Sequence, residues 1–232
     1  MALHDGHRAR LRNRFVNEGL EHFQEINVLE ILLFHCIPRV DTNPIAHRLL
    51  DEFGSLTNVL EASVEDLQKV EGIGENSAIF LSLVNATNRY YMTKKAEVKG
   101  PIERPEQYIS YLAPRFIGRK NETVFILCMD SQRKIICCKQ LSEGTVLSVN
   151  TPIRKIVEAA ITSNATYAVL AHNHPDGSVL PSNSDYRTTE RVAKSLAEVE
   201  VCLLDHVIFS DTDHVSMKLS SDYSFPDNGA FI

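Results

Sequence analysis

Apolar residues in the first hundred positions recur in short helical runs, and capping residues separate these runs. Residues 27–37 (NVLEILLFHCI) form the most apolar run, and Pro38 ends it because proline cannot continue a helix. Asn43 and Pro44 are typical of the N-cap and first position of another helix, which Gly54 closes at its C-terminus. These patterns predict short helices and no strand in this part of the chain.

Three further helices are expected before residue 92. A brief one covers residues 55–62, and Ser63 with Asp66 has the S-x-x-[DE] form of a capping box that opens the next. A longer helix is expected from about residue 76 to residue 91. The first hundred residues are therefore predicted to be all-α.

The turn before the longest helix, Gly72-Ile73-Gly74, resembles a helix-hairpin-helix motif. Two glycines permit a tight turn, and free N–H groups at the following helix start could hold a phosphate of DNA. Glu75 argues against this, because a carboxylate competes with phosphate for the positive helix end. Gly72 and Gly74 are thus candidate DNA contacts, with packing or a partner contact as the favoured alternative.

Four arginines lie close together near the N-terminus. Arg8 with Arg12, and Arg10 with Arg14, would be i,i+4 neighbours on a helix. A solvated basic face is the simpler interpretation, and an arm that contacts phosphate is the alternative.

A polar segment at 94–105 (KKAEVKGPIERP) is the best linker candidate. We place the boundary near 99–104 and predict domains at 1–99 and 100–232. Beyond the linker, strands are expected at 122–129, 134–139, about 144–149, 166–171, 200–210 and 214–219. Helices are expected at 105–116, 153–164 and 184–199. Strands mixed with helices predict an α/β or α+β domain.

Composition and charge narrow the class of protein. No apolar run approaches the roughly 18–20 residues of a membrane span, and the N-terminus has no apolar stretch typical of a signal peptide. Five cysteines without a C-x-x-C pair predict reduced thiols in a cytoplasmic protein. The formal net charge is −6, and both halves are acidic, which argues weakly against strong electrostatic binding to nucleic acid.

The most informative stretch is AHNHPDGSVLPSNSD, residues 171–185. It follows an apolar strand, in which alternate side chains share a face, so His172 and His174 are expected to point the same way. A Pro/Gly loop leads to a new helix that carries Ser182 and Asp185 one turn apart. Two histidines and one carboxylate are the ligand set of a catalytic zinc site, which keeps one position for water.

Each feature also has a structural interpretation. Ser182 and Asp185 form a capping box on their own account, and histidines can be polar residues at a strand end. The combination favours a metal site, because no single structural reason accounts for all of it. A zinc deaminase is disfavoured, since the segment lacks H-x-E and P-C-x-x-C. His206 is expected to be a core or outer residue rather than a fourth ligand.

With this motif the chain resembles a known family. His172-x-His174 followed by Ser182 and Asp185 is similar to the JAMM (MPN+) metalloprotease motif. The wider text AVLAHNHPDG with LLDEFGSL, GIG, SEGTVLSV and LDHVI resembles the bacterial RadC proteins, the UPF0758 group, historically labelled DNA repair proteins. Many members read HNHPSG where this chain has Asp176, a departure that removes no ligand.

The resemblance implies a JAMM/MPN-type, cytidine-deaminase-like domain preceded by an all-α helix-hairpin-helix domain. It implies that His172, His174 and Asp185 bind Zn²⁺ and that Ser182 steadies the developing oxyanion. It also implies that Glu122, on an earlier strand, is the general base. From the residues alone, Glu122 would be an ordinary charged residue at a strand start.

Three functions follow from these features. The first is a zinc hydrolase that cleaves a peptide or isopeptide bond in a protein or peptide substrate. The alternative is a DNA-binding protein of repair or recombination, with the metal domain accessory or nucleolytic. The third is a scaffold with a structural metal, against which the open ligand position counts. No membrane partner is expected, and no feature specifies an oligomeric state.

Overall fold

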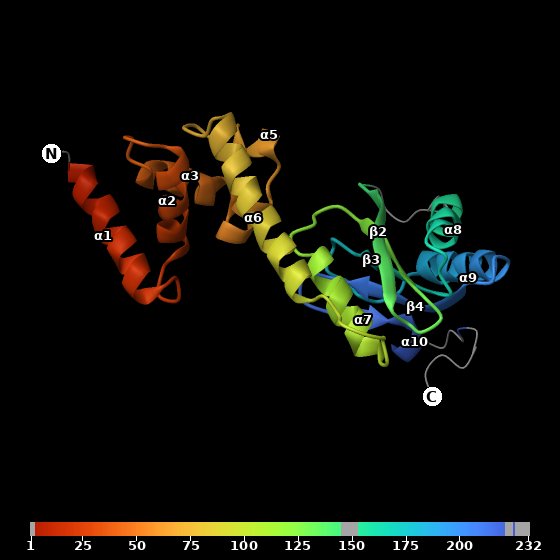
Figure 1. The fold of residues 1–232 in the computed structure, drawn as a ribbon. Coiled ribbons are helices and arrows are strands. Elements are labelled where there is room, and N and C mark those ends of the chain that lie inside the picture. The colour runs from red at the N-terminus through yellow and green to blue at the C-terminus, as the bar shows by residue number, and fades with distance from the viewer. Residues whose placement is uncertain (1–2, 145–152, 221–224, 226–232) are drawn as a thin grey trace. The chain divides into compact units, whose positions relative to one another are not determined.

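The computed structural model describes residues 3–144, 153–220 and 225. The chain divides into two compact units, Met1–Asn88 and Arg89–Ile232 (Figure 1). Residues 3–100 contain helices and no strand, which confirms the predicted helical N-terminal region. The helices that begin there are α1 (Leu3–Glu18), α2 (Glu25–Cys36), α3 (Asn43–Phe53), α4 (Leu56–Glu61), α5 (Val64–Leu67) and α6 (Glu75–Lys95).

The helical unit is built around the apolar run of α2. Leu29 and Leu33 are fully buried and pack with Leu49 of α3 and Leu67 of α5 in one cluster. Gly54 closes α3 with a φ of 82°, as predicted. The predicted N-cap at Asn43 is wrong by one residue. Thr42 is the N-cap, and Asn43 is already the first helical residue.

The turn at Gly72 has a packing reason. Its φ is 97°, and a Cβ there would lie 2.9 Å from the side chain of Ile45. Arg48 Nε also donates to the carbonyl of Glu71 at 3.0 Å. Nothing lies within 4 Å of a Cβ placed at Gly74. The two glycines of the predicted motif therefore differ, because only Gly72 is required by the local structure.

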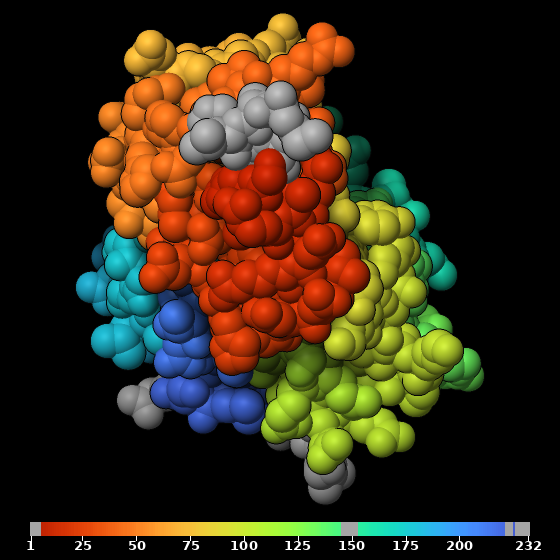
Figure 2. All heavy atoms as spheres, turned by 90° about the vertical axis from the view of Figure 1, so that its left-hand side faces the viewer, coloured from red at the N-terminus to blue at the C-terminus, as the bar shows by residue number. Residues whose placement is uncertain are grey.

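Helix α1 lies at the surface of its unit, where Figure 2 shows it in red. Arg8 and Arg12 both lie over the ring of Phe34, at 4.8 and 5.8 Å from its centroid. Arg14 lies 4.6 Å from the centroid of Phe23 and donates to the His22 carbonyl. Three of the four arginines thus hold α1 in place within the unit.

Helix α6 is longer than predicted and ends at Lys95, so the first two residues of the expected linker are helical. The split between the compact units falls at Asn88, inside this helix. The domain boundary that we place near residues 99–104 stays a prediction.

The second unit contains a five-stranded sheet with helices on both faces, which confirms the predicted mixed α/β class (Figure 1). The strands lie in the order β2-β1-β3-β4-β5. Only β3 and β4 are parallel; the other neighbours are antiparallel. The strands are β1 (Thr123–Met129), β2 (Ile135–Glu143), β3 (Tyr167–Asn173), β4 (Cys202–Phe209) and β5 (His214–Ser216). The helices are α7 (Pro105–Leu112), η1 (Ala113–Arg115), α8 (Ile153–Thr162), α9 (Asn183–Ala197) and α10 (Met217–Ser220).

The two faces of the sheet carry separate apolar clusters. One face packs against α7 through Tyr108 and Leu112. The other packs against α8 and α9 through Ile156 and Val192. Alternation along β3 sends Leu170 to the α8–α9 face and Ala171 to the α7 face. His172, two positions after Leu170, therefore belongs to the α8–α9 face.

A bulge in β4 interrupts this alternation. Ala168 pairs with Leu203 and Val169 pairs with Asp205, so Leu204 is an extra residue. A bulge re-aims the side chains that follow it. It places Asp205 on the α7 face, where Tyr108 Oη donates to it at 2.9 Å. It also pairs His206 with Leu170, on the face of His172.

The segment expected at about 144–149 lies mostly outside the described residues. The strand expected at 214–219 is wrong in its second half, because Met217–Ser220 is a helical turn. The Lys218 N–H donates to Asp205 Oδ1 rather than to a strand neighbour.

Candidate metal centre

His172, His174 and Asp185 come together at the end of β3 and the start of α9. One ligand atom of each lies within 4.8 Å of the others. The two histidine Nε2 atoms are 2.9 Å apart, and they lie 3.3 and 3.5 Å from the oxygens of Asp185. This is the trio that the sequence analysis proposed as ligands.

Extended backbone beyond the last residue of β3 brings the two histidines together. The His174 N–H donates to the Phe209 carbonyl of β4 at 2.8 Å, so pairing continues through this residue. The chain then turns, with the Gly177 N–H donating to the His174 carbonyl and Gly177 at a φ of 85°. Asp176 accepts from the Ser178 N–H, so the departure from the family pattern helps to shape this loop.

The start of α9 presents Asp185. Ser182 is the N-cap, its Oγ accepts from the Asp185 N–H, and its own N–H donates to Asp185 Oδ2 at 2.7 Å. The capping box that the sequence offered as a structural alternative is therefore present. It does not compete with metal binding, because it holds Oδ2 and leaves Oδ1 directed at His172. The Ser182 hydroxyl also donates to Asp185 Oδ2, at 2.6 Å.

The donor set fits a transition metal. The His174 Nδ1 lies 2.7 Å from the Ser178 carbonyl, which can only accept, so this nitrogen carries the proton and Nε2 keeps its lone pair. The Nδ1 of His172 is occupied by His206 Nε2 at 2.8 Å. Two imidazoles and a carboxylate suit zinc and its neighbours rather than calcium or magnesium.

Burial and charge perturb these groups strongly. Burial lowers the pKa of His172, and it lowers the pKa of His206 well below the ordinary value. Burial alone would raise the pKa of Asp185, but hydrogen bonds from His172 and His174 hold it well below its usual range. The hydrogen bond to Asp185 raises the pKa of His174. The centre therefore joins a carboxylate to two imidazoles, and a metal would compete with a proton chiefly at His174.

One side of the centre is open to solvent. The His172 side chain is fully buried, whereas that of His174 is 17% exposed. Ser182 and the loop from Pro175 to Ser178 are exposed as well. The loop side is therefore the solvent-facing edge of the centre.

Glu122, the predicted base, lies just before β1. Val124 pairs with His172, so the two side chains share a face, and residues two positions away on each strand share it too. Glu122 and His174 are those residues. Glu122 is 8% exposed. Its backbone is held by the residue that follows β2, because the Gly144 N–H donates to the Glu122 carbonyl at 3.1 Å.

Sequence reasoning missed Asn173 and Thr189. Asn173 Oδ1 accepts from the Thr123 N–H at 2.8 Å, and its Nδ2 donates to the carbonyl of Asn121 at 3.3 Å. Thr189 contacts the ring of His206. The position of Asn173 between two candidate ligands could have indicated that its polar side chain supports the site. No sequence signal existed for Thr189, whose role depends on packing between α9 and β4.

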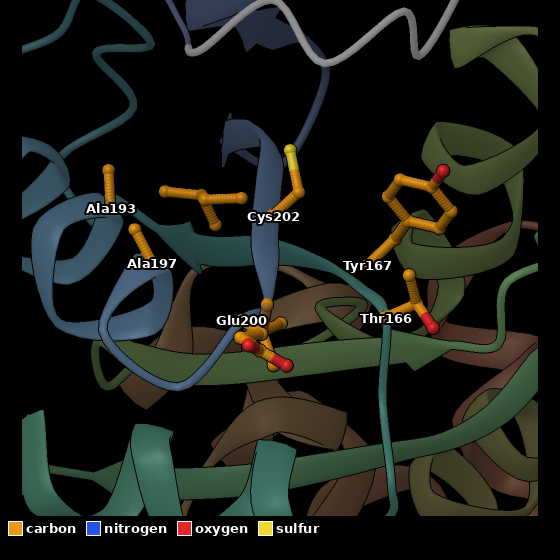
Figure 3. A pocket seen from close by; sticks show the side chains of 8 residues that line it. Thr166, Tyr167, Ala193, Ala197, Glu200 and Cys202 are labelled. Carbon is orange, nitrogen blue, oxygen red and sulfur yellow. The ribbon is translucent and has the colours of Figure 1, made fainter.

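A separate cavity of about 340 Å³ lies at the opposite end of β3 and β4 (Figure 3). Tyr167 and Cys202, the first residues of these strands, line the cavity. The other labelled lining residues are Ala193 and Ala197 of α9, Thr166 and Glu200. The cavity contains none of the candidate ligands. It is therefore distinct from the centre at the other end of β3.

Comparison with known proteins covers both units. A model described as RadC-like JAB domain matches residues 102–222, and one described as UPF0758 N-terminal matches residues 6–79. A UPF0758 protein of Fusobacterium nucleatum subsp. nucleatum is 34% identical over 218 residues, which cover 91% of this chain and 94% of that relative. A UPF0758 protein of Ruegeria pomeroyi is 31% identical over 212 residues, with 91% and 95% covered.

Proposed function

The chain belongs to the UPF0758 family with a RadC-like JAB domain, and from this premise we propose that it is a zinc-dependent hydrolase of peptide or isopeptide bonds. The observation that carries the proposal is the convergence of His172, His174 and Asp185 at the end of β3, where His174 forms the solvent-facing edge. With three ligands from the described residues, a bound zinc ion would have a coordination position left for water, as catalytic zinc sites do and structural ones do not.

Zinc bound at this centre would lower the pKa of a water molecule to about 7 and polarise a carbonyl oxygen. The protein supplies the remaining groups. His172 and Asp185 are buried and rigidly held, so they orient the centre, and His174 lies at its open edge. Such fixed geometry is what makes an electrostatic site effective without reorganisation during the reaction.

Glu122 is proposed as the general base. It would accept a proton from the attacking water and pass it to the leaving nitrogen of the scissile amide. Its support is that Val124 pairs with His172, so that extended backbone two positions earlier would keep Glu122 on the same face, together with its low exposure. A buried carboxylate on that face is in the right surroundings for proton transfer.

Ser182 is proposed as a donor to the developing oxyanion. Its hydroxyl has one hydrogen, which now goes to Asp185 Oδ2. To act on substrate, this hydrogen must turn away from the carboxylate. Asp185 Oδ2 would still keep the hydrogen bond from the Ser182 N–H at 2.7 Å. The capping box therefore allows the turn without releasing the ligand.

DNA binding by the helical unit stays an alternative that no feature of the described residues favours. Arg8, Arg12 and Arg14 have aromatic or carbonyl partners within their own unit. Gly72 is explained by its close approach to Ile45. No described helix is long and apolar enough to cross a membrane; the cytoplasmic location remains a prediction.

The test of the hydrolase is cleavage of a peptide and isopeptide library by zinc-loaded protein. Glu122→Gln should bind zinc like the wild type and lose at least about 100-fold in rate, the usual scale of general base catalysis. His47→Ala, which removes an exposed histidine of the helical unit, should leave the rate unchanged. Wild-type cleavage that persists in Glu122→Gln would rule out the assigned base, and a zinc-loaded wild type that cleaves nothing in the library would contradict the proposed bond class.

A further inference from the structure

A chain of three buried hydrogen bonds connects two of the metal-ligand residues through groups that are not ligands. His172 Nδ1 lies 2.8 Å from His206 Nε2, and His206 Nδ1 lies 2.7 Å from Thr189 Oγ1. Thr189 Oγ1 in turn lies 2.6 Å from the backbone carbonyl of Asp185. His172, His206 and Thr189 are each 0% exposed, so water does not substitute for any of these bonds.

The direction of each bond follows from what each group can donate. The Asp185 carbonyl only accepts, so the single hydroxyl hydrogen of Thr189 goes to it. Met217 Sδ is also in reach of this hydroxyl, at 3.4 Å, but a thioether is the weaker acceptor. The Thr189 oxygen is then an acceptor for His206, so His206 carries its proton on Nδ1.

The proton on His206 Nδ1 determines the direction of the remaining hydrogen bond in the series. A neutral imidazole with a proton on Nδ1 has a bare Nε2, and His206 Nε2 therefore accepts from His172 Nδ1. His172 then has a bare Nε2, which is the atom directed at His174 and Asp185. The reversed chain would put a proton on His172 Nε2, where it would block a metal.

The hydrogen-bond chain depends on the bulge in β4. If β4 ran through Leu204 in strict alternation, without the bulge, His206 would turn toward the α7 face, away from His172. Thr189 follows Asp185 by one helical turn, so its hydroxyl reaches back to the carbonyl of a ligand residue. The bulge and the helical spacing bring the three side chains together.

We propose that Thr189 and His206 are positioning residues that hold His172 in the tautomer that binds metal. The inference rests on the metal binding of the proposed function, and it is independent of whether the protein hydrolyses any bond. Partners of this kind typically change metal affinity by about 10- to 100-fold when removed. The three hydrogen bonds also connect His172 to the first turns of α9, which carry Asp185, so the two ligands are oriented together.

The test measures zinc affinity by competition with a chromophoric chelator for three matched variants. Thr189→Val keeps the side-chain shape but removes the oxygen, so it should weaken zinc binding by about 10- to 100-fold. Thr189→Ser keeps the hydroxyl and should bind within about threefold of wild type by the same reasoning. Thr188→Val removes the neighbouring hydroxyl of α9, on a residue 8% exposed, and should not change the affinity.

Unchanged affinity in Thr189→Val, while the wild type binds zinc, would overturn the role of the hydrogen-bond chain and leave the proposed site intact. Equal losses in Thr188→Val and Thr189→Val would also overturn it, because they would reflect general loosening of α9. A wild type that binds no zinc would contradict the proposed function itself. The outcomes are thus distinguishable.

A second measurement uses the wild type and does not depend on how the variants fold. Ring ¹⁵N–¹H spectra of zinc-loaded protein report which nitrogen of each histidine is protonated. His206 can be assigned through its contact with His172, whose ring centroid is 4.8 Å away. The proposal requires a proton on His206 Nδ1 and none on Nε2. A proton on Nε2 would overturn it.

Discussion

Asn173 and Thr123, fifty positions apart in sequence, are joined by a hydrogen bond of 2.8 Å from the Thr123 N–H to the side-chain oxygen of Asn173. The same side chain donates to the Asn121 and Arg119 carbonyls. Asn173 therefore holds the backbone on both sides of Glu122. The residue between the two histidines fixes the segment that carries the proposed base.

Replacing Asn173 should loosen that segment and leave the metal ligands in place. Asn173→Ala removes a buried side chain with three hydrogen bonds, which should cost about 1–3 kcal/mol locally and speed amide exchange at Thr123 roughly 5- to 150-fold. Hydrogen-exchange mass spectrometry of residues 119–124 measures this. Asn121→Ala is the control, because Asn121 accepts through its backbone carbonyl. Unchanged exchange in Asn173→Ala would contradict the role of Asn173.

The pH dependence of stability should differ between metal-free and zinc-bound protein. The hydrogen bond to Asp185 raises the pKa of His174 above its unfolded value. The resulting stability is fully present below the unfolded pKa of about 6.5 and is lost as pH rises through the folded pKa. With zinc the trend should reverse, because protons compete with the metal for Nε2.

Urea unfolding between pH 6 and 9 measures this effect, with and without a chelator. The free energy of unfolding of wild type minus that of His174→Ala should fall with pH in the chelator and rise with pH in zinc. The same slope under both conditions would mean that protons and zinc do not share this site.

The two glycines of the N-terminal turn should respond differently to alanine. Gly72→Ala places a Cβ 2.9 Å from Ile45 at a φ of 97°, so it should lose about 1–3 kcal/mol of unfolding free energy. Gly74→Ala meets nothing within 4 Å and should stay within about 1 kcal/mol of wild type. Equal effects in urea unfolding would contradict the packing explanation of Gly72.

Gly74→Ala also tests DNA binding. If the backbone at Gly74 approached a phosphate, a methyl group there should weaken salt-dependent binding to duplex DNA without destabilising the fold. We expect no such binding at physiological salt, because three of the four arginines of α1 contact aromatic rings within their own unit. Tight, salt-dependent binding that Gly74→Ala abolishes would support the DNA alternative.

Structural features that depend on residues close together in sequence could be predicted from the sequence. Alternation along TYAVLA placed His172 and His174 on one face, and S-x-x-D predicted the capping box at Ser182. Family resemblance identified Glu122, which the residues alone would not have singled out. Its assignment as the base remains a prediction, although the strand register places it on the face of His172.

The features that the sequence did not reveal depend on tertiary packing. A bulge at Leu204 cannot be read from LLDHV, where strict alternation would put His206 on the wrong face. Thr189 reaches His206 only because α9 packs against β4. The end of the predicted strand at 214–219 is helical, because Asp205 accepts from the Lys218 N–H across the fold. Each of these depends on residues distant in sequence.

We propose above that His172, His174 and Asp185 bind one zinc ion. Elemental analysis of purified protein measures this binding, with His174→Ala and the exposed-site control His47→Ala prepared in the same way. We expect one zinc per chain in the wild type and in His47→Ala, and little or none in His174→Ala. Full zinc retention in His174→Ala would rule out this set of ligands.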